Sequence, residues 1–320
     1  MQRLQAQERA ASILAFGDLQ LPLRTARALD RPYFHVVFTI PERLNALILH
    51  TPEILYAILL RAAGQALIDV AASRLRAHIG VLTVLHTWGQ TLVFHPHVHC
   101  VVPGGGFSFD GRRWVRVPTG TFLLAVQVLS RRFRTLVKNA ITEAYDDGSL
   151  EIPPHIARDR TALDLLLARA SKTDWHTYVK PPFGGPEQVL AYLASYTHRV
   201  AISNQRIIAF DGERVTFQYR DYHDGNARKS IELPAVEFLR RFLLHVVPKR
   251  FTRIRYYGFL ANRDRTANIE KARALIASTR TLSPRPPAPD PRRCPQCGQG
   301  TMRTRAMIDP QRPRTWFDSS

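Results

Sequence analysis

The chain has 320 residues, of which 45% are hydrophobic. This is enough apolar material for one large or two small domains with a core, and it excludes disorder along the whole chain. No stretch reaches the roughly 18 consecutive apolar residues that a membrane span needs. The N-terminal residues lack the basic run, apolar segment and cleavage site of a secretory signal, so we expect a cytoplasmic protein without a membrane partner.

The charge is strongly positive, with 45 Lys and Arg against 26 Asp and Glu for a formal net charge of +19. Arginine dominates, and guanidinium groups match phosphate oxygens, so the excess favours a polyanionic partner. An arginine-rich composition of the whole surface is the alternative. Clustering argues against it, because basic and aromatic side chains alternate between residues 240 and 265. The residues expected to bind DNA are Arg199, Arg240, Arg241, Lys249, Arg250, Arg253, Arg255, Tyr256 and Tyr257.

The first half of the chain alternates strand and helix patterns. The sequence predicts a buried strand over 33–40, a helix over 52–77 with Thr51 as its N-cap and Gly80 as its end, neighbouring antiparallel strands over 81–88 and 97–102, a hairpin turning at Asp110 and Gly111, and a helix over 122–145. The glycine run after Pro103 precedes a strand and not a helix, so we interpret it as a turn and not a phosphate-binding loop.

The second half continues without a regular βαβ alternation. The sequence predicts a helix over 163–170, a strand over 175–180, a helix from 186, a hairpin turning at Asp211 and Gly212, a possible third strand over 230–233, an amphipathic helix over 234–247, a strand over 252–256 and a helix to about 279. This order favours an α+β fold with a mostly antiparallel central sheet flanked by helices. We expect an N-terminal segment at 1–30, a folded domain at 31–280 and a disordered, proline-rich tail at 281–320.

The segment HPHVH, residues 95–99, contains three histidines, and the last two flank the apolar residue Val98. His97 and His99 lie two apart on a predicted strand, so both imidazoles project from the same face and can bind one metal ion. A histidine on an apolar face is more often an ordinary core residue, so the pair needs a second element. His95 shares this parity, but we expect Pro96 to start or kink the strand and to leave His95 at the rim.

The second element is a pair of tyrosines, Tyr192 and Tyr196, in the helix predicted after residue 186. Their spacing of four places the two phenols on one face of the helix. Packing at the edge of the core is the alternative for either ring. Together with the histidines and the positive charge, the pair favours a metal-assisted tyrosine nucleophile.

These motifs resemble those of the two-tyrosine HUH rolling-circle transposases of the insertion sequence ninety-one type. The matching segments span about residues 31–280, and the most specific are HPHVH and YLASYTHRVAISN. The resemblance implies an HUH catalytic domain that cleaves and transfers single-stranded DNA at the element ends and at the target. It further implies Tyr192 and Tyr196 as nucleophiles that form a 5′-phosphotyrosine link, and Mg²⁺ or Mn²⁺ without a nucleotide cofactor.

The resemblance assigns the metal to His97, His99 and a third, oxygen-bearing ligand. We expect Gln90 in this role, because related replication initiators carry an acidic or amide side chain seven residues before the first histidine of the motif. His35, His86 and His198 are rivals, and a structural role is as plausible for each.

The chain departs from the family upstream of residue 31, where it has no cysteine for the usual zinc-binding module. Cys294 and Cys297 offer only two zinc ligands, so we expect no zinc in this chain alone. Two alternatives to an active transposase stay open. One is a degenerate nucleic-acid-binding protein derived from a transposase, and the other is a relaxase or replication initiator with the same chemistry. The oligomeric state is not predicted.

Overall fold

The computed structural model describes residues 29, 31–117, 124–172, 175–180, 201–222 and 224–280, without the side chains of the last two. Within these ranges the elements are β1 (Tyr33–Thr39), a short 3-10 helix (Glu42–Leu44), α2 (Asn45–His50), α3 (Pro52–Leu75), β2 (Ala77–His78), β3 (Gly80–Trp88), β4 (Phe94–Pro103), β5 (Gly105–Ser108), β6 (Trp114–Arg116), α4 (Val126–Asp146), α5 (Arg160–Ser171), β7 (Thr177–Lys180), β8 (Ile207–Phe210), β9 (Arg214–Asp221), β10 (Ala227–Pro234), α7 (Ala235–Leu243), β11 (Ile254–Gly258) and α8 (Arg265–Arg280).

A five-stranded sheet forms the centre of the fold, in the order β11-β3-β4-β1-β7. Every neighbouring pair in it is antiparallel. The strands are rich in valine and aromatic residues, whose side chains pack well on a pleated surface. The expected α+β class with a mostly antiparallel sheet flanked by helices is therefore confirmed.

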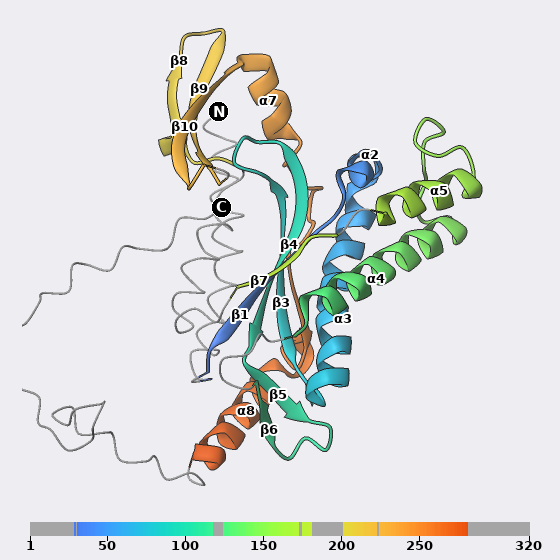
Figure 1. Cartoon of the computed structure of the whole chain (residues 1–320), viewed down its shortest axis with the longest axis vertical. Helices are drawn as coiled ribbons and strands as arrows, with labels where there is room; N and C mark the ends of the chain where they lie inside the picture. The colour runs from blue at the N-terminus through green and yellow to red at the C-terminus, as the bar shows by residue number, and fades with distance from the viewer. Residues whose placement is uncertain are drawn as a thin grey trace, which may run out of the picture.

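The two faces of this sheet differ because side chains alternate along each strand. Val36 and Phe38 of β1 and Cys100 of β4 belong to the main hydrophobic core, which they share with α3 and α4. Figure 1 shows these two helices side by side along one face of the sheet. The strand register places His35, His97 and His99 on the opposite face. We call the two sides the helix face and the histidine face.

Helix α3 is the longest helix among the described residues, and it runs across the helix face from Pro52 to Leu75. By length and composition it could cross a membrane, but 67% of its most apolar window is buried inside the fold. Packing against the sheet and α4 accounts for its apolar composition. Thr51 occupies the N-cap position as predicted, but its hydroxyl makes no cap hydrogen bond and donates instead to the carbonyl oxygen of Glu151. The helix ends at Leu75, two residues earlier than predicted, Arg76 follows in the left-handed conformation, and Gly80 begins β3.

Strand β4 begins at Phe94, so Pro96 does not start the strand, and of the two predicted alternatives the local irregularity is the one observed. His86 pairs with His97 and Trp88 pairs with Phe94, which leaves His95 and Pro96 opposite the single residue Thr87. This is a β-bulge, where a ladder hydrogen bond is already lost and a proline without an N–H is tolerated. His95 is exposed, as expected for the rim.

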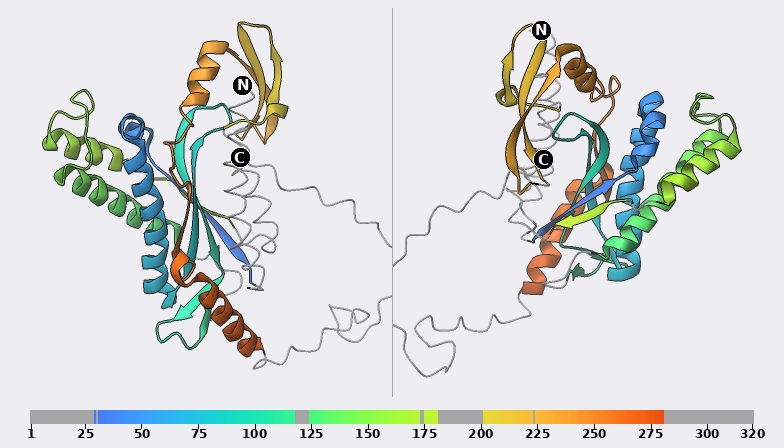
Figure 2. Two further views of the ribbon diagram at one scale, coloured as in Figure 1. Left: turned by 180° about the vertical axis from the view of Figure 1, so that it is seen from behind. Right: turned by 45° about the horizontal axis from the view of Figure 1, so that its top comes forward.

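A second sheet, β8-β9-β10, forms a small unit with α7 at one end of the central sheet, as Figure 2 shows from two further sides. The predicted hairpin and its third strand are confirmed, although α7 ends at Leu243 and not near residue 247. Leu92, from the turn between β3 and β4, is fully buried in the core of this unit beside Phe217 and Phe238. The turn therefore fastens the small unit to the central sheet.

The other end of the central sheet carries the β5–β6 hairpin and helix α8 (Figure 1). Phe107 and Phe259 each meet the ring of Trp114 edge to face there, and the three share a small core with Ile269. The hairpin turns at Gly111 with φ 67°, as the Asp-Gly pair predicts. Helix α4 begins at Val126, four residues later than the pattern over 122–145 suggests.

Candidate metal centre and nucleic-acid interface

Three histidines from two adjacent strands converge on the histidine face. His97 and His99 lie on β4, and His86 of β3 is directly opposite His97. One ring nitrogen from each lies within 4.8 Å of the others. The predicted pair is thus joined by His86, which the sequence left as one of three rivals for the third ligand.

The protonation of His97 is fixed by a backbone hydrogen bond. Its Nδ1 lies 2.6 Å from the carbonyl oxygen of His95. A carbonyl oxygen only accepts, so Nδ1 carries the proton and Nε2 is the nitrogen that can ligate a metal. Burial lowers the pKa of His97 to about 4, so the ring is neutral at physiological pH.

His99 is held in a similar way by another imidazole. Its Nδ1 lies 2.7 Å from Nε2 of His35, and the two rings stack with centroids 5.0 Å apart. Both side chains are nearly inaccessible, with exposed fractions of 1% for His35 and 6% for His99. Burial lowers the pKa of His99 far below its usual value, and so does the positive charge that His86, His97, His35 or Lys180 would place beside it.

The donor set fits a divalent transition metal. Metal binding requires neutral imidazoles, and burial keeps all three rings neutral because it lowers the pKa of His86, His97 and His99. A metal with bonds of about 2.1 Å to imidazole holds its ligand atoms at most about 4.2 Å apart. The present spread of up to 4.8 Å is therefore slightly wide, and small ring rotations would close it.

Gln90, the third ligand expected from the resemblance, lies in the turn after β3 and not on the strand itself. Its side-chain amide donates to the hydroxyl of Tyr222 and accepts from the backbone N–H of Arg220. The backbone carbonyl oxygen of Gln90 accepts a hydrogen bond from the guanidinium group of Arg206. In this structure Gln90 therefore links the β3–β4 turn to the small sheet.

Lys180, which the sequence analysis did not single out, is a cation on the histidine face. It is directly opposite His35 in the pairing of β1 with β7. Partial burial lowers the pKa of its ammonium group, and its charge in turn helps to lower the pKa of His35 to about 3. The sequence alone does not predict a role for Lys180, because only the pairing of β7 with β1 brings this lysine beside a histidine.

The residues expected to bind DNA are divided among several surfaces. Arg240 and Arg241 project from α7, and both form ion pairs with Glu237 that lower the pKa of its carboxyl to about 2. Along β11 the register places Arg255 on the helix face and Tyr256 on the histidine face. The predicted basic and aromatic segment is therefore not one continuous surface.

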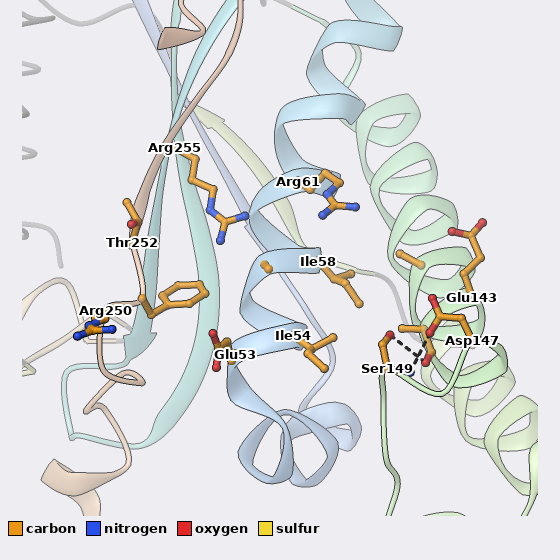
Figure 3. Close-up of a pocket in the computed structure, with 14 residues that line it drawn as sticks. Glu53, Ile54, Ile58, Arg61, Glu143, Asp147, Ser149, Arg250, Thr252 and Arg255 are labelled. Atoms are coloured by element: carbon orange, nitrogen blue, oxygen red, sulfur yellow. Dashed lines mark hydrogen bonds between the residues drawn. The ribbon is translucent and has the colours of Figure 1, made fainter. Parts of the chain in front are cut away.

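On the helix face this segment helps to form an open pocket of about 500 Å³ between α3, α4 and the residues before β11. Figure 3 shows that Arg61 of α3 and Arg255 of β11 line the pocket together with Glu143 of α4 and Asp147, the residue after α4. The guanidinium group of Arg255 also stands 5.4 Å from the ring centre of Phe251. Because the pocket lies across the sheet from the histidines, it is separate from the candidate metal centre.

Other basic and aromatic residues of the segment predicted to bind DNA contact residues of the protein itself. Arg253 donates to the backbone oxygen of His245, and the guanidinium group of Arg265 lies 4.0 Å from the ring centre of Tyr256. Tyr257 is half-buried against α3 at Gly64, and Lys249 and Arg250 are exposed. Several predicted site residues lie outside the described part of the chain: Tyr192, Tyr196, His198, Arg199, Cys294 and Cys297.

The chain is similar to known transposases over most of its length. Residues 80–267 match the family model Y2_Tnp, described as "Putative transposase". The chain is 43% identical to "Putative transposase y4qJ" of Sinorhizobium fredii over 92% of this chain and 79% of that protein. It is 31% identical to "Transposase for insertion sequence element IS801" of Pseudomonas savastanoi pv. phaseolicola, over 91% of this chain and 72% of that protein.

No solved structure matches the chain. The family match includes β3 and β4, and so contains all three histidines of the candidate metal centre. The breadth of the match and the identity to these relatives establish that the chain belongs to the Y2_Tnp family of transposases.

Proposed function

We propose that this transposase is an HUH-type enzyme that cleaves single-stranded DNA and transfers the cut strand through a tyrosine-linked intermediate. The observation that carries the proposal is the convergence of His86, His97 and His99 on one face of the central sheet. Neutral imidazoles at this spacing, two of them buried and one partly buried, are a ligand set for a divalent metal. When bound, the ion supplies Lewis-acid polarisation of a non-bridging oxygen of the scissile phosphate.

The nucleophile is the phenol of Tyr192 or Tyr196. Its oxygen bonds to phosphorus as the bond from phosphorus to the 3′ oxygen breaks, which leaves a 5′-phosphotyrosine and a free 3′-hydroxyl. The phenol loses one proton and the leaving 3′ oxygen gains one, so no external reactant is consumed. The phosphotyrosine keeps the energy of the broken bond, so strand transfer needs no ATP.

The chain's own cations assist by binding phosphate. Lys180 stands on the histidine face opposite His35, and an ammonium group there favours an anionic backbone beside the metal centre. The exposed cations Lys249 and Arg250 and the net charge of +19 favour DNA over a neutral substrate. We propose single-stranded DNA at the element ends and at the target as the partner.

The test is adduct formation on single-stranded DNA from the ends of the protein's own coding locus. The purified protein is incubated with this DNA and either Mn²⁺ or EDTA, and a denaturing gel separates covalent adducts. Tyr192→Phe and Tyr196→Phe are compared with Tyr145→Phe, a matched control on α4 across the sheet from the histidines. We expect an adduct that needs the metal and disappears in one or both of the first two variants, but not in the control.

Two results would contradict the proposal. An adduct that persists without divalent metal would remove the role of the histidines. Salt-sensitive DNA binding without any adduct would identify a degenerate, non-catalytic DNA-binding protein instead.

A further inference from the structure

We propose that His35 is a positioning residue that fixes the tautomer and the ring orientation of His99. The inference rests on the proposed metal centre and concerns a residue outside its three ligands. The observation is the contact across the β1–β4 pair, where Nε2 of His35 lies 2.7 Å from Nδ1 of His99 and the rings are inclined by only 11°.

The direction of this hydrogen bond follows from comparison with His97. There the Nδ1 proton is donated to a backbone carbonyl, which leaves Nε2 for the metal. The hydrogen-bond partner of Nδ1 is the imidazole of His35 in the case of His99, and a backbone carbonyl in the case of His97. For the Nε2 atom of His99 to bind a metal, its Nδ1 must hold the proton and donate it to Nε2 of His35. His35 must then carry its own proton on Nδ1.

Burial supports the neutral form of His35 that this arrangement needs. The side chain is 1% exposed, and a charge on a buried ring without an anionic partner is costly. A neutral imidazole has one nitrogen that accepts, whereas an imidazolium has none. A hydrogen bond from a metal-ligating histidine to a residue that does not itself bind the metal orients the imidazole and makes it a better ligand.

Simple packing does not account for a histidine at this position. Val37, the next residue of β1 on the same face, is apolar, and a buried polar ring is costly unless it is hydrogen-bonded. The presence of a histidine at position 35 is therefore best explained by the hydrogen bond that its Nε2 accepts from His99. A residue that keeps an acceptor should replace it in part, and a residue that keeps only the ring should not.

The experiment measures Mn²⁺ affinity by calorimetry for the full chain and for two variants. His35→Phe keeps an aromatic ring without an acceptor, and His35→Gln keeps an acceptor oxygen. We expect Mn²⁺ to bind roughly 10- to 100-fold more weakly to His35→Phe, and His35→Gln to recover most of the affinity. His245→Phe is the matched control, since His245 is also buried but is not among the three ligands, and its Mn²⁺ affinity should equal that of the wild type.

A second measurement does not depend on the variants folding. Long-range ¹H–¹⁵N spectra of the metal-free wild type report which nitrogen of each histidine carries the proton. We expect His99 protonated on Nδ1 and His35 protonated on Nδ1. A proton on Nε2 of His99 would overturn the proposal.

The failure of the metal centre and that of this inference are distinguishable. If the wild type binds no Mn²⁺, the proposed metal centre fails, whereas the tautomer of His99 still decides the role of His35. If the wild type binds Mn²⁺ and folded His35→Phe binds it equally well, the role of His35 is refuted. Equal losses in folded His35→Phe and His35→Gln would also refute it, because the acceptor would then not matter.

Discussion

His86 of β3 and His97 of β4 are directly opposite one another in the antiparallel register, and their rings meet edge to face with centroids 5.4 Å apart. This pairing brings a third imidazole to the two histidines of the motif. Because opposite residues in antiparallel strands share a face, the register alone decides that His86 points to the same side as His97.

Removal of His86 should weaken metal binding, whereas removal of Gln90 should not. We expect His86→Ala to lower Mn²⁺ affinity by more than about 10-fold, the loss that even an outer-shell partner brings. Gln90→Ala should leave Mn²⁺ affinity unchanged and lower the free energy of unfolding by about 1 kcal/mol, because it removes hydrogen bonds to Tyr222 and Arg220. Calorimetric titration and urea unfolding measure the two effects. The reverse result would identify Gln90 as the oxygen-bearing ligand that the family resemblance implies.

Mn²⁺ should bind more tightly than Mg²⁺ and should support faster cleavage at equal concentration. Three imidazoles offer only nitrogen donors, whereas Mg²⁺ prefers oxygen and keeps several waters. Titration of the protein with each ion, followed by the cleavage assay, tests this order. Tighter binding of Mg²⁺ would mean that oxygen ligands dominate the site.

The free energy of unfolding should decrease as the pH falls from about 6.5 to about 4, partly because of His245. Burial lowers the pKa of this histidine to about 4, below the usual value of about 6.5. Between these values the unfolded chain binds a proton that the folded chain does not, so acid favours unfolding. The shift corresponds to at most about 3 kcal/mol at pH 4.

The test compares the wild type with His245→Gln, which does not titrate in this range. Nε2 of His245 lies 3.2 Å from the carbonyl oxygen of Leu92, and the glutamine amide keeps a donor for it. We expect the variant to lose less stability than the wild type between pH 7 and pH 4.5 in urea unfolding. An identical pH dependence of the two proteins would show that the folded and unfolded states bind protons equally at His245.

Gly64→Ala should destabilise the protein although alanine is the better helix former. In an exposed helix this change would add up to about 1 kcal/mol. Here a Cβ at position 64 would lie 2.5 Å from the ring of Tyr257, so α3 and β11 must separate. We expect a net loss of about 1 to 3 kcal/mol, typical of overpacking. The double variant Gly64→Ala with Tyr257→Leu should recover part of it. If Gly64→Ala alone raises the melting temperature, the space between Gly64 and the ring of Tyr257 is large enough for a methyl group.

Much of the fold could be predicted from local patterns. The strand at 33–40, the two strands that carry His86 and His97, and the hairpin at Asp211 and Gly212 follow from short-range periodicity and turn residues. Boundaries were less predictable, because they depend on contacts distant in sequence. Thr51, for example, occupies the predicted N-cap position, but its hydroxyl donates to the distant carbonyl oxygen of Glu151 and makes no cap hydrogen bond.

Local sequence is enough to predict that His97 and His99 share one face, because alternation along a strand is a local property of the backbone. The sequence by itself also determined the positive charge and the resemblance to transposases. Three contacts could be recognised only in the folded chain: His86 joins the pair, His35 contacts His99, and Gln90 binds Tyr222. These relationships depend on the order and register of β1, β4 and β3 and on the docking of the small sheet. Long-range packing fixes both, and no pattern within one segment encodes them.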